Sequence, residues 1–140
     1  MIRKETTWKN PAGSWTIIKN LLDPTVVMKN CTLYVFSKNK LDTSYCTIQT
    51  HKAYVQLSTL VTKKKYRGNK YGKNLLDHVI KDQHKTIYLI ARDDLTQLYT
   101  KRGFKITNKN IPLPVKWRYI WSNTYNTLFR NQKSHVLRRK

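Results

Sequence analysis

The alternation of apolar and polar positions predicts a strand followed by a helix in the middle of the chain. Between residues 53 and 62 apolar and polar side chains alternate with the period of a strand. From residue 75 to residue 80 the apolar positions recur at helical spacing instead. Residues 63–71 therefore form the turn that joins this strand to this helix.

The residues before this strand predict an antiparallel meander. Residues 31–37 and 45–50 are rich in β-branched and aromatic types, and the polar residues 38–44 between them predict a turn. The polar and basic residues 1–13 predict an extended arm or loop, and residues 14–22 predict a short helix that ends at Asp23-Pro24.

After the central helix, residues 86–91 form an apolar run that predicts a buried central strand, parallel to the strand at 53–62. Asp93 or Asp94 can cap the next helix, and Gly103 can end it in the left-handed conformation. Phe104–Thr107 predicts the start of a further strand.

Two predictions concern the carboxyl-terminal third of the chain. Alternation of Trp117, Tyr119 and Trp121 with other residues predicts a last strand over 116–122 that pairs with residues 104–107. The basic tail, residues 124–140, either contacts phosphates and bases or forms a solvated, frayed terminus.

Charge indicates an anionic partner. The chain of 140 residues has 28 Lys and Arg against 7 Asp and Glu, a formal charge of +21. Because this exceeds what solubility requires, we expect a polyanion such as DNA or RNA, or an acidic or nucleic-acid-bound protein, as a partner. A basic surface with another origin is the alternative. The sequence has no apolar run of 18 residues and no signal-peptide pattern, so we expect a cytoplasmic protein without a membrane partner.

Cysteine and histidine spacing does not predict a metal site. Cys31 and Cys46 form no CxxC pair, and in an intracellular protein we expect them to be buried free thiols. The four histidines show no ligand spacing, so we expect no metal.

The turn at 63–71 has the features of an anion site. A helix that begins after a strand leaves its first N–H groups without partners and directs the positive end of its dipole at the turn. Gly68 and Gly72 allow close approach of the backbone, and six Lys and Arg side chains between Lys63 and Lys73 supply positive charge.

These residues resemble the acetyl-coenzyme-A-binding motif of the GNAT (Gcn5-related) N-acetyltransferases, Arg/Gln-x-x-Gly-x-Gly/Ala. Arg67 and Gly72 match its ends, and Lys70 stands where the middle glycine is usual. The segment Leu98-Tyr99-x-x-x-Gly103-Phe104 resembles the second GNAT signature. The resemblance implies a single α/β (α+β) domain over residues 1–140, with a mixed, mostly antiparallel sheet flanked by helices and splayed at the coenzyme site, and with residues 1–30 on the acceptor side.

The resemblance also implies the cofactor and the site. The cofactor is acetyl-coenzyme A, and Tyr99 is the general acid that protonates the departing thiolate, since a phenol and a thiol have similar pKa values. Backbone N–H groups near Leu60 or Val61 would stabilise the oxyanion. The implied coenzyme-binding residues are Leu60, Val61, Thr62, Tyr66, Arg67, Gly68, Asn69, Lys70, Tyr71, Gly72 and Lys73.

The general base is not evident from the sequence. The strand at 53–62 has no carboxylate, so His51 is the nearest titratable candidate, and ordered water or an acceptor with a depressed pKa is the alternative. In many GNAT members an Asn that contacts pantetheine occupies the position of Arg92. Ser58 with Asn69 also resembles the Mom proteins of phages, GNAT-fold enzymes that modify adenine in DNA, which makes Ser58 a further catalytic candidate.

The sequence thus predicts an acyl-coenzyme-A-dependent N-acyltransferase that acts on an amine of a nucleic acid or of a nucleic-acid-associated protein. Trp8 and Trp15 are candidate walls of the acceptor site. The alternatives are Mom-like modification of DNA bases, a non-catalytic GNAT-like binding module, and a small-amine acetyltransferase. Whether the protein is a monomer or a homodimer stays open.

Overall fold

The computed structural model describes residues 1–6 and 31–140. The helix predicted for residues 14–22, and with it Trp8 and Trp15, lies outside the described residues. By its internal contacts the chain divides into two compact units. Unit 1 comprises Met1–Lys52 and Ser58–Asp82, and unit 2 comprises Ala53–Leu57 and Gln83–Lys140. That residues 1–140 form one domain stays a prediction.

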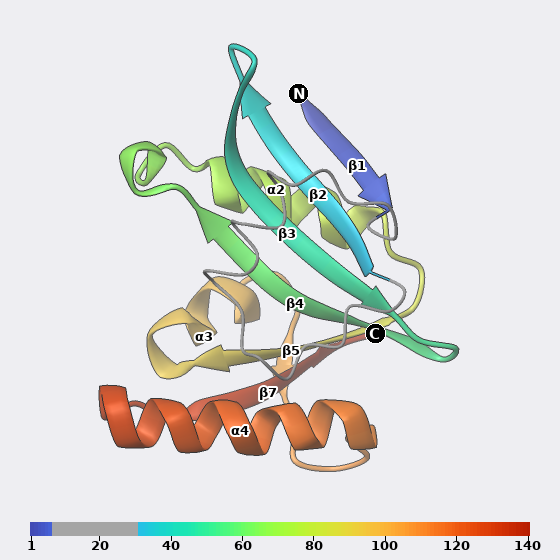
Figure 1. Cartoon of the computed structure of the whole chain (residues 1–140). Coiled ribbons are helices and arrows are strands. Elements are labelled where there is room, and N and C mark those ends of the chain that lie inside the picture. The colour runs from blue at the N-terminus through green and yellow to red at the C-terminus, as the bar shows by residue number, and fades with distance from the viewer. Residues whose placement is uncertain (7–30) are drawn as a thin grey trace. The chain divides into compact units, whose positions relative to one another are not determined.

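Unit 1 is built from strands in the order β1-β2-β3-β4 and from one long helix (Figure 1). Its elements are β1 (Ile2–Thr6), β2 (Cys31–Lys38), β3 (Leu41–Thr50), the second half of β4 (Tyr54–Thr62), the 3-10 turn η1 (Lys64–Tyr66) and α2 (Tyr71–Lys81). The strand β2 pairs antiparallel with both β1 and β3. The antiparallel pairing of β2 with β3 confirms that part of the predicted meander. The turn between β2 and β3 is shorter than predicted, because only Asn39 and Lys40 separate the strands, both with positive φ.

The core of unit 1 lies between α2 and the sheet. The apolar face of α2 is buried through Leu75, Leu76, Val79 and Ile80, in agreement with the predicted helical period. The helix contacts β2 and β3, whose central residues are buried. Cys31 and Cys46 are both buried and neither is in a disulfide, as predicted, and burial raises the pKa of Cys46.

The prediction of an arm or loop at the amino terminus is wrong for residues 2–6, which form the edge strand β1. Arg3 makes a two-pronged ion pair with Asp42, with Nη1–Oδ1 and Nη2–Oδ2 distances of 3.1 and 3.0 Å. The sequence of β1 has too few apolar residues to predict a strand, because an edge strand is held by backbone pairing and by such side-chain contacts.

Unit 2 has the strand order β4-β5-β7-β6 and two helices. Its elements are the first half of β4, β5 (Thr86–Arg92), α3 (Asp93–Thr100), β6 (Lys105–Ile106), α4 (Leu113–Arg130) and β7 (Ser134–Arg139). The strands β4 and β5 are parallel, which confirms the predicted crossover, and β7 pairs antiparallel with both β5 and β6. A cluster around Tyr88, Val115 and Val136 forms the core beneath α4.

The last strand was predicted at the wrong place. Residues 116–122 are part of the helix α4, and the strand that pairs with β6 is β7, inside the region predicted as a basic tail. Trp117 and Trp121 satisfy a period of two, but they are also one helical turn apart, and Tyr119 between them packs against the core of unit 2. Residues 134–139 are thus an internal strand, with Val136 and Leu137 buried.

The helix α3 begins at Asp93, which is one residue earlier than a cap at Asp93 requires and two earlier than a cap at Asp94 requires. Arg92 occupies the cap position, no side chain caps the helix, and both aspartates lie in its first turn. Asp93 instead accepts a hydrogen bond from the N–H of Lys133 and contacts the ring of His135. Gly103 has the predicted left-handed conformation, with φ of 83°.

The predicted mixed, mostly antiparallel sheet flanked by helices is confirmed, since β4 and β5 form its parallel pair. That parallel ladder runs from Tyr54↔Thr86 to Leu57↔Leu89. It ends there within the described residues, although β4 continues to Thr62 and β5 to Arg92. That the sheet is splayed at the coenzyme site stays a prediction.

Candidate functional site

The turn between β4 and α2 uses two left-handed residues to direct the chain into the helix. The 3-10 turn η1 is closed by the N–H of Tyr66, which donates to the carbonyl of Lys63 at 2.9 Å. Gly68 then has φ of +85° and Lys70 has φ of 60°. Lys70 thus has the conformation that glycine adopts most easily, at the position where the GNAT motif usually has glycine.

The backbone N–H groups of residues 68–73 form a row of unused donors. None of them donates a hydrogen bond to a described residue, and the first amide of α2 with a partner is Asn74, which donates to Lys70 O at 2.9 Å. No side chain caps the helix. Since a row of amides at the start of a helix attracts anions, the turn has the backbone geometry that can bind a phosphate, and we call it the phosphate turn.

Side chains of the turn bind its carbonyl groups and leave these amides available. Asn69 Nδ2 donates to Tyr66 O at 3.2 Å, and Arg67 Nε donates to Thr62 O at 3.2 Å. Both contacts fix the shape of the loop through its carbonyl oxygens. Neither contact uses a backbone N–H group, so these groups remain available to a ligand.

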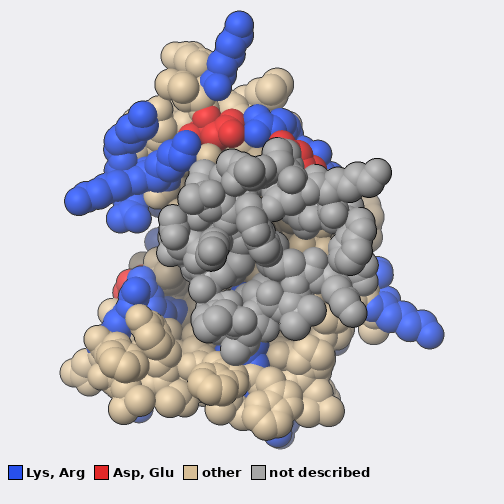
Figure 2. Space-filling model, in the orientation of Figure 1, with Lys and Arg blue, Asp and Glu red and all other residues tan. Residues whose placement is uncertain are grey.

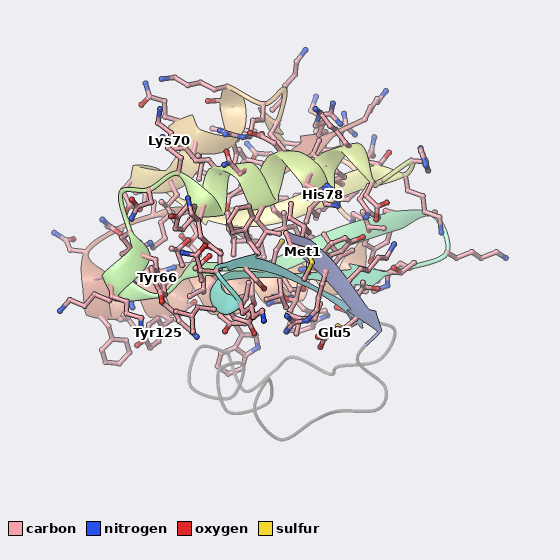
Figure 3. The ribbon with its side chains drawn as sticks, turned by 90° about the horizontal axis from the view of Figure 1, so that it is seen from above. Met1, Glu5, Tyr66, Lys70, His78 and Tyr125 are labelled. Carbon is pink, nitrogen blue, oxygen red and sulfur yellow. The ribbon has the colours of Figure 1, made fainter. Side chains whose placement is uncertain are left out.

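The charge of the turn favours an anionic ligand. The first turn of α2 has no acidic residue, and Lys70 and Lys73 are exposed there. Figure 3 shows Lys70 at the start of the helix. Lys64, Lys65 and Arg67 are also exposed. Cations at the positive end of a helix dipole oppose helix formation, so this arrangement becomes favourable when an anion is bound between them.

The two glycines of the turn have different physical roles. A Cβ on Gly68 would meet no atom within 4 Å, so Gly68 is required for its positive φ and leaves open space above the loop. A Cβ on Gly72 would lie 2.6 Å from Thr62 Oγ1, so Gly72 is required for contact between α2 and β4. Thr62 Oγ1 is in turn 2.9 Å from Ser44 Oγ on β3. Ser44 is buried in this contact, and no local pattern in the sequence marks it.

The aromatic residues of the turn anchor the start of α2. Tyr71 stacks on Phe36 of β2, with ring centroids 5.2 Å apart and an interplanar angle of 18°. Tyr66 lies 6.4 Å from Tyr71, and Lys65 Nζ lies 4.8 Å above the Tyr66 ring. The side chain of Tyr71 therefore holds the helix to the sheet. Only the backbone N–H of Tyr71 belongs to the row of unused donors.

Ser58, Leu60, Val61 and Thr62 lie together in the second half of β4, and all four are half-buried. They follow Leu57, where the ladder to β5 ends. The Lys63 amide then donates to Thr43 O at 2.9 Å, which fixes the end of β4 to β3. Unit 1 thus contains all eleven residues that the sequence predicts to bind the coenzyme, and Ser58 as well.

His51 lies at the opposite end of β4 from the phosphate turn. It follows the end of β3 and precedes Tyr54, and the nine residues of β4 span about 26 Å at the rise of an extended strand. Partial burial lowers the pKa of His51, so its imidazole is neutral at pH 7. Its charge state suits a base, but the structure does not bring it to the turn.

Tyr99 lies in unit 2, at the end of α3, and is buried. Its ring contacts Phe104 edge to face, with centroids 5.9 Å apart, and its carbonyl accepts hydrogen bonds from the amides of Arg102 and Phe104 at 2.9 and 3.3 Å. The second motif is therefore a compact helix end that fixes the Tyr99 ring. Arg92, where many GNAT members have Asn, makes an ion pair with Asp94 at 3.0 Å.

A family model described as an acetyltransferase (GNAT) domain matches residues 29–106, which is more than half of the chain. The chain belongs to the GNAT acetyltransferase family. This GNAT protein is therefore an acyl-coenzyme-A-dependent N-acyltransferase. The match includes the phosphate turn, Tyr99 and Gly103, and it ends before α4 and β7. The search of curated protein sequences found no match.

Solved structures similar to this GNAT protein share its fold at low sequence identity. ElaA from Escherichia coli has a TM-score of 0.67 and 13% identity, over 100% of this chain and 99% of that one. An acyl-CoA N-acyltransferase from Pseudomonas aeruginosa has a TM-score of 0.68 and 12% identity, over 100% and 99%. A GNAT family acetyltransferase from Elizabethkingia anophelis, solved with acetyl-CoA bound, has a TM-score of 0.68 and 15% identity, over 100% and 97%.

Two further findings concern ligands and location. In residues 1–6 and 31–140, no group of three or more His, Cys, Asp or Glu side chains is placed to hold a metal ion. None of the described helices has the length and apolar character needed to cross a bilayer.

Proposed function

We propose that this GNAT protein transfers an acetyl group from acetyl-coenzyme A to an amine, and that the pyrophosphate of the coenzyme binds the amides of residues 68–73. The observation that carries this proposal is the row of unused N–H donors at the start of α2, surrounded by cations and without an acidic residue. The resemblance of the fold to an acetyltransferase with acetyl-CoA bound supports acetyl as the group transferred.

The reaction needs three functions from the protein. The neutral amine attacks the thioester carbonyl carbon, a C–N bond forms, and the carbonyl oxygen becomes an oxyanion. Backbone amides in the second half of β4, near Leu60 or Val61, stabilise this charge. The C–S bond then breaks, and the thiolate takes a proton from the phenol of Tyr99.

The amine must lose a proton to react further. No carboxylate occurs on β4, and His51 lies at the end of β4 remote from the phosphate turn. We infer that water carries this proton from the attacking nitrogen and that a proton returns to the Tyr99 phenolate. The acceptor amine is neutral when it attacks, either because it arrives with a depressed pKa or because it first loses a proton to water. Either route makes the pH dependence of the reaction a property of the acceptor rather than of His51.

The charge supports a macromolecular acceptor, an amine of a nucleic acid or of a protein bound to one. Coenzyme A can neutralise only a few of the charges that make up +21. After Asp94 the chain has eleven Lys and Arg and no Asp or Glu, so the excess is not confined to the turn. A surface of this kind would raise the local concentration of a polyanion.

Binding of the coenzyme is tested by thermal shift with two ligands. Acetyl-coenzyme A should raise Tm, whereas acetyl-pantetheine, which lacks the phosphates, should raise it far less. Replacing Lys70 and Lys73 by Glu should remove most of the difference between the two ligands. Lys52→Glu, an exposed lysine beyond the far end of β4, is the matched control and should preserve it. Equal shifts from both ligands would contradict phosphate binding at the turn.

The acceptor is tested by mass spectrometry after incubation with isotopically labelled acetyl-coenzyme A. The labelled acetyl group should appear on an amine of a nucleic acid or of a basic protein bound to it. The yield should fall steeply between about 50 and 200 mM salt if phosphate contacts bring the acceptor. Label found only on free small amines, without salt dependence, would contradict a macromolecular acceptor.

A further inference from the structure

The helix α4 is polar toward the sheet over its second half. Asn126 is buried, and its Nδ2 donates to Ser134 Oγ on β7 at 3.0 Å. Asn123 Oδ1 accepts the amide of Ser134 at 2.9 Å, and Ser122 Oγ lies 3.4 Å from Ser134 Oγ. These contacts fix the rotation of α4, so its opposite face is held toward solvent.

That opposite face is apolar and aromatic. Seven large apolar side chains of α4 are between 46 and 72% exposed: Leu113, Trp117, Ile120, Trp121, Tyr125, Leu128 and Phe129. At about 200 Å² for each ring, the four aromatic side chains alone expose roughly 500 Å². The three aliphatic side chains take the patch beyond what monomeric proteins usually leave uncovered. In Figure 2 the surface over α4 is accordingly mostly tan.

We propose that this face binds the same face of a second copy of the chain, with the two α4 helices antiparallel and Trp121 at the two-fold axis. The spacing of the patch is symmetric about Trp121. Trp117 and Tyr125 lie four residues to either side, and Leu113 and Phe129 lie eight residues to either side. Each step of four residues turns the helix about 40° beyond a full turn, so Trp117, Trp121 and Tyr125 share a face, and Leu113 and Phe129 lie at its two margins. Antiparallel contact therefore pairs Trp117 with the partner's Tyr125 on either side of Trp121.

Area and local charge fit this occupant. A standard interface buries about 800 Å² on each partner, which the seven side chains of the patch approach. Trp and Tyr are also the residues that most often dominate the binding energy of interfaces. The nearby basic residue Arg118 lies opposite the partner's Thr124 in this register, since both are three residues from Trp121. Like charges are thus kept apart at the contact itself.

The first test measures the mass of the protein in solution by sedimentation equilibrium. The wild type should be a dimer, and Trp121→Glu should weaken dimerisation by at least about 30-fold, because it places two carboxylates at the centre of the interface. Leu41→Glu changes an exposed leucine in unit 1 and should leave the dimer intact. A wild type that is monomeric at high concentration, or a Trp121→Glu variant that still dimerises, would overturn the proposal.

The second test addresses the register. Trp117→Glu and Tyr125→Lys should each weaken the dimer, and the double variant should recover it. In the double variant the Glu at position 117 of each copy faces the Lys at position 125 of the other copy, so the dimer contains two new ion pairs. In a parallel arrangement like charges would meet and the double variant would be no better than either single one. Failure of recovery, with both single variants folded by circular dichroism, would overturn the antiparallel contact.

The salt dependence of binding distinguishes a second copy of the chain from an anionic membrane as the partner of this face. Two copies with a charge of +21 each repel one another, so raising salt from about 50 to 500 mM should strengthen the dimer. Binding to vesicles of phosphatidylcholine and phosphatidylserine would instead weaken with salt. A monomeric wild type that binds these vesicles through Trp121 would assign the face to a membrane and overturn the dimer.

Discussion

Gly72 and Thr62 are packed so closely that a Cβ on residue 72 would lie 2.6 Å from Thr62 Oγ1. Gly72→Ala should therefore destabilise the protein by about 1–2 kcal/mol, even though alanine is the better helix residue. The start of α2 would move away from β4, so the affinity for acetyl-coenzyme A should fall as well. Urea unfolding and thermal shift with the coenzyme measure the two effects.

A double variant tests whether this contact is the cause. Thr62→Ala removes the Oγ1 and leaves a Cβ 3.9 Å from the added methyl group. It also breaks the hydrogen bond to Ser44. The double variant Thr62→Ala, Gly72→Ala should therefore be more stable than the sum of the two single effects predicts. Strictly additive effects would mean that Gly72 is required for another reason.

Lys70 combines a strained backbone with a charge at the phosphate turn, and two variants separate these properties. Lys70→Gly removes both, and we expect it to stabilise the free protein by about 0.5–1 kcal/mol because glycine adopts positive φ at little cost. Lys70→Ala removes only the charge and should not stabilise it. If the ammonium group contacts the pyrophosphate, both variants should bind acetyl-coenzyme A more weakly, to the same extent. Loss of binding in Lys70→Ala alone would assign the effect to the backbone.

The phosphate turn could be predicted from the sequence because its causes are local. The strand before it, the helix after it and the positive φ at Gly68 all follow from residues that are neighbours in the chain. The contact of Gly72 with Thr62, and of Thr62 with Ser44, joins three separate elements. No local pattern marks such a contact, so Ser44 was missed.

The carboxyl-terminal third could not be predicted correctly because its polarity is inverted. In α4 Trp117 and Trp121 face solvent and Asn126 faces the sheet. The expectation that large apolar residues lie in the core therefore leads to a strand at these positions. The true strand β7 has only the short apolar pair Val136-Leu137 between basic residues. The strand β7 is stabilised by its antiparallel pairing with β5, a contact between distant residues that the sequence of β7 alone does not reveal.

Acid should weaken the attachment of β1. The Arg3 guanidinium, which donates hydrogen bonds to Asp42, and the hydroxyl of Ser37 hold the pKa of that carboxyl below its ordinary value. The unfolded chain therefore binds this proton more readily, so the stabilisation is present above about pH 4 and is lost as pH falls through the folded pKa. Asp42→Asn should cost about 0.5–1 kcal/mol at pH 7 after screening by solvent, and the difference from wild type should shrink as pH falls through the folded pKa of Asp42. A difference that stays constant from pH 7 to pH 2, measured by urea unfolding, would contradict this ion pair.

Tyr99→Phe separates the chemical role of the phenol from its structural role. The ring contact with Phe104 and the hydrogen bonds to the Tyr99 carbonyl do not involve the hydroxyl, so α3 should keep its end. If the phenol protonates the departing thiolate, kcat should fall by about 10²–10⁴-fold, the usual contribution of a general acid, while KM for the coenzyme changes little. Tyr119→Phe, which alters a partly buried tyrosine of α4 packed against the core of unit 2, is the matched control and should leave kcat unchanged. An unreduced kcat in Tyr99→Phe would exclude the phenol as the acid, whereas an increase in KM with constant kcat would assign Tyr99 to binding of the coenzyme.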